Sequence, residues 1–128
     1  MEFYNSKTVP HSFEDTLVKV QEELKKEGFG IITEINVTDV FKNKLNIDFM
    51  KYRILGACNP VFAHRALLID EKVGVMLPCN VILVEKEVNL TEVSTINPAK
   101  SMSTINITQL TEIAEEINTK LMNVLEKL

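Results

Sequence analysis

The stretch from Cys79 to Glu87, with the sequence CNVILVEKE, decides the fold. Its centre, Val81-Ile82-Leu83-Val84, is apolar at successive positions, so both faces of an extended strand would carry apolar side chains. A strand of this kind belongs in a sheet that is covered on both sides. Val88-Asn89-Leu90 follows, and Asn89 is well suited to a positive φ. We therefore expect a hairpin that leads into another strand over residues 91–96.

Two apolar stripes predict long helices, one near each end of the chain. The first stripe consists of Phe13, Leu17, Val20 and Leu24. Ser12 can cap the first turn of this helix, and Gly28 can adopt the left-handed conformation that ends it. Asn106 with Gln109 resembles a capping box before the second helix. The second stripe consists of Leu110, Ile113, Ala114, Ile117, Leu121, Val124, Leu125 and Leu128.

Shorter patterns predict the remaining strands and helices. Strands are expected over residues 2–8, where the strand would lie at a sheet edge, and over residues 29–37 and 50–58. A short helix fits residues 38–46, with Thr38 as a possible cap. A further helix would begin at Asn59-Pro60 and stop before Gly74.

This order of elements predicts an α+β fold in a single domain, residues 1–128. We expect a two-layer sandwich, a mostly antiparallel sheet with the two long helices on one face, in the order β-α-β(4)-α with short inserted helices. The other face would then require a cover, which indicates a homodimer or a ligand on that side. Within residues 50–58, Tyr52 and Ile54 are expected on the same face as Cys58, and Lys51 and Arg53 on an opposite, solvated face.

Composition excludes several classes of protein. The chain has 128 residues, 45% of them hydrophobic, a net charge of −4, and two cysteines. This excludes a mainly disordered chain and a disulfide-stapled scaffold. No apolar run approaches the length of a membrane span, and residues 1–4 do not resemble a secretory signal. We therefore expect a cytoplasmic protein with no membrane partner, and the mildly acidic charge disfavours nucleic acid as a partner.

Two segments carry the residues with possible chemistry. Gly56-Ala57-Cys58-Asn59-Pro60 and Gly74-Val75-Met76-Leu77-Pro78-Cys79-Asn80 each place a Cys-Asn step beside a proline at the end of a strand. If the two strands are antiparallel neighbours, Cys58 and Cys79 lie at the same end of the sheet. The sequence therefore predicts a site near Cys58, Asn59, Cys79 and Asn80, with His64 as a further candidate.

Three functions are compatible with these residues. In the first, the site binds a small ligand or a soft metal ion, with Cys58 and Cys79 as candidate metal ligands. The sequence has no Cys-x₂₋₄-Cys unit of the kind that zinc sites usually contain. In the second, Cys58 is the nucleophile of a thiol-redox or sulfur-transfer enzyme, activated by the helix that follows it, and Cys79 is the resolving thiol. In the third, both cysteines are packing residues in a structural or partner-binding dimer. The cofactor, if any, is unknown.

The same segments carry a family resemblance. Residues 52–60 (YRILGACNP), 63–67 (AHRAL) and 77–85 (LPCNVILVE) resemble the bacterial and archaeal domain of unknown function 302 family. Residues 27–30 (EGFG) fit the same pattern. The resemblance implies a fold similar to that of the TATA-binding protein and a homodimer, and it implies no established activity. A likeness of fold does not imply DNA binding.

Overall fold

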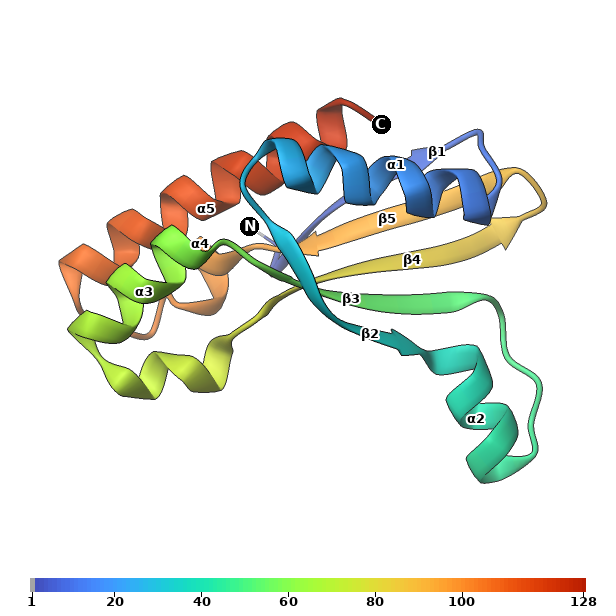
Figure 1. Ribbon diagram of the computed structural model, residues 1–128, viewed down its shortest axis with the longest axis horizontal. Helices are drawn as coiled ribbons and strands as arrows, with labels where there is room; N and C mark the ends of the chain where they lie inside the picture. Colours follow the sequence, from blue (N-terminus) through green and yellow to red (C-terminus); the bar gives the residue numbers. More distant parts are fainter. Residues whose placement is uncertain (1) are drawn as a thin grey trace.

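A five-stranded sheet is the framework of the structure, a computed structural model that describes residues 2–128 (Figure 1). The strand order is β1-β5-β4-β3-β2, and every neighbouring pair is antiparallel. The predicted N-terminal strand does lie at an edge of the sheet. The strands are β1 (Tyr4–Val9), β2 (Gly30–Asn36), β3 (Tyr52–Cys58), β4 (Cys79–Glu87) and β5 (Leu90–Ile96).

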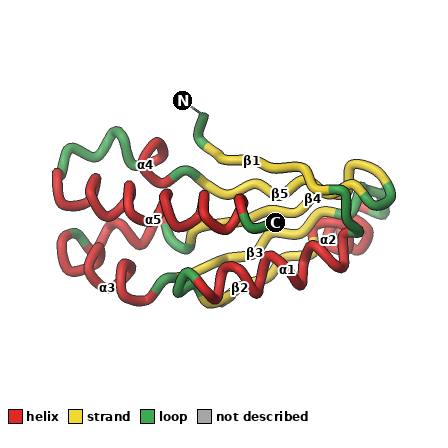
Figure 2. The backbone as a smooth tube through the Cα atoms, turned by 90° about the horizontal axis from the view of Figure 1, so that it is seen from above, coloured by secondary structure: helices red, strands yellow, loops and turns green. Residues whose placement is uncertain are grey.

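The two long helices lie on the same face of the sheet, as Figures 1 and 2 show. This arrangement confirms the predicted α+β class. None of the helices within residues 2–128 is both long enough and apolar enough to cross a membrane. The helices are α1 (Phe13–Lys26), α2 (Val37–Leu45), α3 (Pro60–Ile69), the 3₁₀ helix η1 (Glu71–Met76), α4 (Pro98–Ser101) and α5 (Thr108–Glu126).

The core lies between this helix layer and the sheet. Val81 and Leu83 of β4 are fully buried against the helices, and so is Leu55 of β3. Leu24 of α1 and Leu121 of α5 are fully buried from the other side. Because burial of one such side chain contributes about 1.5–3 kcal/mol, these contacts hold the two layers together.

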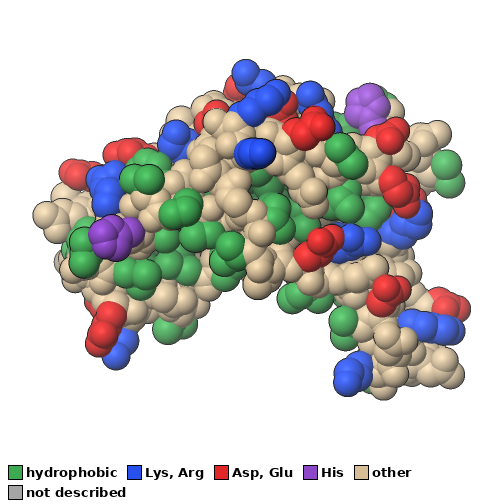
Figure 3. Space-filling model, viewed as in Figure 1, with side chains coloured by type: hydrophobic (Ala, Val, Ile, Leu, Met, Phe, Trp, Pro, Cys, Tyr) green, Lys and Arg blue, Asp and Glu red, His purple; other side chains and the backbone are tan. Residues whose placement is uncertain are grey.

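The other side of the sheet has no helix layer. Tyr52 and Ile54 of β3 lie there beside Ile82 and Val84 of β4, and these four residues define what we call the open sheet face. Figure 1 shows that α2 projects past this face at one end and that α3 and η1 border it at the other. Hydrophobic side chains gather along the hollow between these helices (Figure 3). β4 is therefore apolar on both faces, as its sequence predicted.

Most helix starts and turns follow the sequence prediction. Ser12 caps α1, because its hydroxyl oxygen accepts a hydrogen bond from the Asp15 amide at 3.1 Å. Gly28 after α1 has φ +87°, and Asn89 in the β4–β5 turn has φ +60°. The helix expected from Pro60 ends at Ile69, and η1 runs on through Gly74.

The caps proposed for α2 and α5 were wrong. Asn36 caps α2 by accepting a hydrogen bond from the Asp39 amide, because the Thr38 hydroxyl donates to the Met50 carbonyl at 2.7 Å instead. The α5 helix starts after Ile107 with no side-chain cap, so Asn106 does not form a capping box. Ile107 packs against the core.

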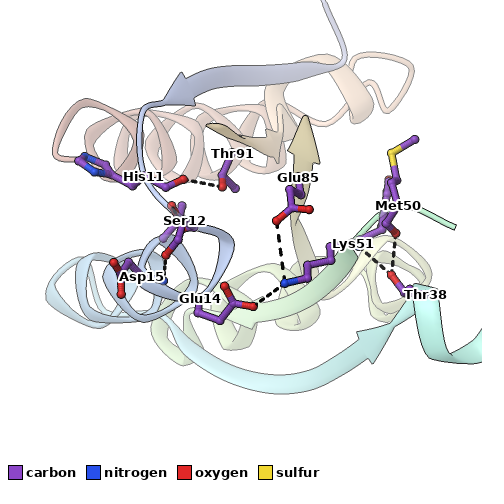
Figure 4. A network of polar contacts seen from close by, with 11 residues as sticks. His11, Ser12, Glu14, Asp15, Thr38, Met50, Lys51, Glu85 and Thr91 are labelled. Atoms are coloured by element: carbon purple, nitrogen blue, oxygen red, sulfur yellow. Dashed lines mark hydrogen bonds and ion pairs between the residues drawn. The ribbon is translucent and has the colours of Figure 1, made fainter. Parts of the chain in front are cut away.

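The expectation that Lys51 and Arg53 occupy a solvated face holds for Lys51, which is exposed, and was wrong for Arg53, whose side chain is only 22% exposed. Both side chains point toward α1, because residues two apart on a strand share a face and Leu55 and Ala57, on the same face, belong to the core. Lys51 Nζ donates to Glu14 Oε1 at 2.8 Å, and this bond lowers the Glu14 pKa (Figure 4). The Arg53 guanidinium lies 5.8 Å from the centre of the Phe13 ring, and it pairs with Glu34.

Gly56 marks the closest approach of neighbouring side chains to β3. A Cβ atom at this position would lie 2.0 Å from Thr33 Oγ1 and 2.9 Å from Pro78 Cγ. Both distances are below van der Waals contact, so a larger residue would force apart β2, β3 and the segment before β4. Gly30, in contrast, has no atom within 4 Å of a built Cβ.

This contrast generates a stability prediction. We expect Gly56→Ala to lower the free energy of unfolding by about 1–3 kcal/mol, because the added methyl group overpacks the site. Gly30→Ala is the matched control and should change stability by less than about 0.5 kcal/mol. Urea unfolding followed by circular dichroism measures both variants. Equal midpoints for the two variants would contradict the packing described for Gly56.

Candidate functional site

The motifs singled out in the sequence meet at one end of the sheet. β3 ends there at Cys58, and β4 begins there at Cys79. The register pairs Ala57 with Cys79, so Cys58 lies one residue beyond the paired position. The prediction that the two cysteines lie at the same end of the sheet is therefore confirmed.

Cys58 and Cys79 line one small cavity on the helix side of the sheet, which we call the thiol cavity. Its volume is about 20 Å³, close to the space that one water molecule requires. Asn59 is the polar side chain in its wall, and the remaining walls are apolar, with Phe62 from α3 and Leu110 from α5. The cavity can therefore hold one ion or one very small molecule.

The two thiols are free and lie in different environments. Cys79 is buried, with 6% of its surface exposed, whereas Cys58 is half-buried. Burial raises the pKa of the Cys79 thiol to about 11, and the nearby Cys58 thiol contributes to the same shift. Cys79 is therefore a neutral thiol at physiological pH. Cys58 lies directly before Asn59, the residue from which α3 begins.

Asn59 does not cap α3 with its side chain, although it occupies the predicted cap position. Asn97, which begins α4 in the same way, accepts a hydrogen bond from the Lys100 amide at 3.2 Å. The Asn59 amide group instead donates to the Glu27 carbonyl at 3.2 Å. Gly28 allows this approach, since a Cβ atom there would lie 3.1 Å from Asn59 Nδ2. Asn59 thus ties the α1–β2 turn to the wall of the thiol cavity.

The other two predicted site residues lie outside the thiol cavity. Asn80 is exposed and lines a separate hollow on the open sheet face with Ile82 and Tyr52. His64 is exposed on α3. The structure therefore brings together Cys58, Asn59 and Cys79 and separates them from His64 and Asn80.

The sequence-based prediction did not include the apolar residues of the cavity wall or the third sulfur-bearing residue. Met102, which follows α4, is buried and contributes to the cavity wall. The available signal was the second Asn-Pro step, Asn97-Pro98, which turns the chain at the end of β5 as Asn59-Pro60 does at the end of β3. Across residues 2–128, His, Cys, Asp and Glu form no group of three or more that could hold a metal ion.

Comparison with known proteins identifies the family. The model of the domain of unknown function DUF302 matches residues 5–128. The chain belongs to the DUF302 family. The crystal structure of an uncharacterized conserved DUF302 protein from Bacillus stearothermophilus has a TM-score of 0.91 and 30% identity, covering 99% of this chain and 98% of that one. No curated protein matches. The DUF302 assignment confirms the predicted family and brings no established activity.

The burial of Cys79 predicts its reactivity in this DUF302 protein. In Cys58→Ser, where Cys79 is the remaining thiol, we expect iodoacetamide at pH 8 to react at least about 100-fold more slowly than in the denatured chain. A pKa of about 11 leaves about 0.1% thiolate at that pH, against about 24% for an ordinary thiol. Mass spectrometry over time measures the rate, and Cys79→Ser reports Cys58 alone. A native rate for Cys79 equal to its denatured rate would contradict the buried position.

Proposed function

We propose that this protein binds a single soft metal ion between Cys58 and Cys79. The observation that carries the proposal is that both thiols line one cavity with room for little more than one ion. Thiolate and thioether ligands favour soft metals, whereas hard cations such as Mg²⁺ and Ca²⁺ prefer oxygen ligands. The wall of the thiol cavity contains no carboxylate.

The volume of the thiol cavity favours a metal ion over a small organic ligand, the two kinds of ligand with which the sequence is compatible. Sites for drug-sized organic ligands have volumes of about 300–1,000 Å³, and the thiol cavity has about 20 Å³. Structural zinc sites use four protein ligands, and the described residues place no third His, Cys, Asp or Glu beside the two cysteines. A soft metal ion with a low coordination number fits both the volume of the cavity and the two available cysteine ligands.

The first turn of α3 begins directly after the Cys58-Asn59 step. The Asn59 side chain is bonded to Glu27, so it leaves the first-turn amide groups of α3 without a side-chain cap. Amide groups at a helix N-terminus carry partial positive charge and stabilise a nearby anion. Binding of the ion would release the thiol protons to solvent and leave metal–thiolate bonds.

The thiol-redox alternative receives less support from the same geometry. It would require Cys79 to resolve a mixed disulfide formed at Cys58. Thiol–disulfide exchange requires a thiolate as the attacking group, and burial, which raises the pKa of Cys79 to about 11, keeps this thiol neutral at physiological pH. A metal ion, in contrast, displaces the thiol proton as it binds. The small volume of the cavity also leaves little space for the group that such an enzyme would carry on Cys58.

Copper(I) binding tests the proposal. The reduced protein is titrated anaerobically with Cu(I) against a competing chelator, and retained metal is counted by native mass spectrometry. We expect one retained Cu(I) per chain in the wild type and a loss of at least about 100-fold in affinity in Cys58→Ser and Cys79→Ser. Each of these variants removes one of two thiolate ligands. Loss of a residue that only hydrogen-bonds to a metal ligand already lowers metal affinity by about 10–100-fold.

Val88→Ser is the matched control, because Val88 is exposed in the β4–β5 turn, beyond the end of β4 opposite to Cys79. It should bind like the wild type. Retention of Cu(I) at wild-type affinity by the Cys58→Ser/Cys79→Ser double variant would overturn the proposal.

A second proposal concerns the open sheet face, which we infer to pack against a second copy of the chain. Ile82 is half-buried on the side of β4 that has no helix layer, and Val84 near it is buried. Across β3, Ile35 of β2 pairs with Ile54 and is 46% exposed. The hollow between Tyr52, Ile82 and Ile96 has a volume of about 260 Å³. The same surface is present on every copy, so two copies related by a two-fold axis would cover each other's apolar face.

The oligomeric state tests this second proposal. We expect the wild type to sediment as a dimer and Ile82→Glu to sediment as a monomer, since the variant would bury a charge at the centre of the interface. Val88→Glu places the same charge on an exposed turn residue and should remain dimeric. Analytical ultracentrifugation distinguishes the two states, and circular dichroism confirms that each variant is folded. A monomeric wild type, or a folded dimeric Ile82→Glu, would exclude the open sheet face as the interface.

A further inference from the structure

A third sulfur-bearing side chain contributes to the thiol cavity. Met102 is 6% exposed and lies in the cavity wall together with Cys58 and Cys79. Met50 and Met122, in contrast, are 50% and 45% exposed and do not line the cavity. The three sulfur residues come from three separate segments, the end of β3, the start of β4 and the segment after α4.

The turn after β5 is built in a way that returns Met102 to this end of the sheet. The Asn97 side chain accepts a hydrogen bond from the Lys100 amide, which fixes the start of α4. The Met102 amide then donates to the Pro98 carbonyl at 2.9 Å, which closes the turn. Met102 is held by backbone hydrogen bonds, so its position does not depend on a flexible loop end.

Two thiols and one thioether form a set of ligands that favours Cu(I) over zinc, calcium and magnesium. A thioether is a soft, neutral ligand, so it adds a metal–sulfur bond without adding a further negative charge to an apolar cavity. Soft thiolate and thioether ligands together favour Cu(I), and a d¹⁰ ion such as Cu(I) accepts three sulfur ligands. Zinc would require a fourth ligand, and calcium or magnesium would require oxygen ligands.

On the basis of the proposed function, we infer that Met102 is the third ligand of a three-sulfur Cu(I) site completed by Cys58 and Cys79. Binding is an exchange of ligands with no change of oxidation state. Cu(I) leaves its carrier or chelator and forms two thiolate bonds and one thioether bond, while the two thiol protons pass to solvent. No oxidant or reductant takes part.

Met102→Leu tests this inference, because leucine keeps the apolar volume and removes the sulfur. We expect the variant to bind Cu(I) at least about tenfold more weakly than the wild type, since even residues that only hydrogen-bond to metal ligands contribute about 10–100-fold to affinity. Copper X-ray absorption should show three sulfur scatterers in the wild type and two in the variant. Met122→Leu makes the same change on the exposed side of α5 and should match the wild type in both measurements.

The outcomes separate this inference from the proposal on which it rests. Wild-type affinity and an unchanged sulfur count in Met102→Leu, with binding lost in Cys58→Ser and Cys79→Ser, would overturn the role of Met102 and leave a two-thiolate site. Wild-type affinity in the cysteine variants would overturn the metal site itself. Thermal unfolding of the metal-free Met102→Leu protein checks that the lost affinity does not come from a lost fold.

Discussion

The antiparallel register between β3 and β4 is the constraint on which the rest of the molecule depends. It pairs Ala57 with Cys79 and Leu55 with Val81. The same alignment that buries the core therefore also brings the end of β3, at Cys58, next to the start of β4, at Cys79. Successive side chains on a strand point to opposite faces, and a slip of one residue would therefore turn Val81 out of the core and move Cys79 away from the cavity. Packing energy in the core thus fixes the position of a site that contributes little to that energy itself.

Polar and steric contacts then fix the positions of the chain segments around the thiol cavity, which hydrophobic packing alone would not fix. Gly56 allows Thr33 and Pro78 to approach β3, and Gly28 allows Asn59 to reach the carbonyl of Glu27. A buried amide group that lacks a partner costs about 1–3 kcal/mol, so the bond from Asn59 favours one arrangement of the α1–β2 turn and the β3–α3 junction. The comparison with Asn97, which caps its own helix in the usual way, indicates that Asn59 is used here to fix the cavity wall.

Much of the fold could be predicted from the sequence because it depends on periodic burial. Such burial is directly visible in the apolar stripes of α1 and α5 and in the centre of β4, which is apolar on both faces. These patterns led to the correct fold class and to the correct prediction that Cys58 and Cys79 lie at the same end of the sheet. The errors concern residues whose partners are distant in sequence. Thr38 bonds to the chain before β3 in place of capping α2, and Arg53 packs on Phe13 in place of facing solvent. Met102 was missed because the Asn97-Pro98 step indicates a turn after β5 but does not show that this turn brings Met102 back to the cavity.

The thiol cavity and the open sheet face lie on opposite sides of the same sheet, so their functions are separable. Cys79 points to the helix side, and its neighbour Asn80 points to the open side, because adjacent residues of a strand alternate. A change at Ile82 therefore alters the second surface without touching the three sulfur groups, and distant sites without shared partners contribute additively. The Cys79-Asn80 step is therefore divided between two surfaces, with Cys79 in the thiol cavity and Asn80 on the open sheet face, whereas Cys58 and Asn59 both line the cavity.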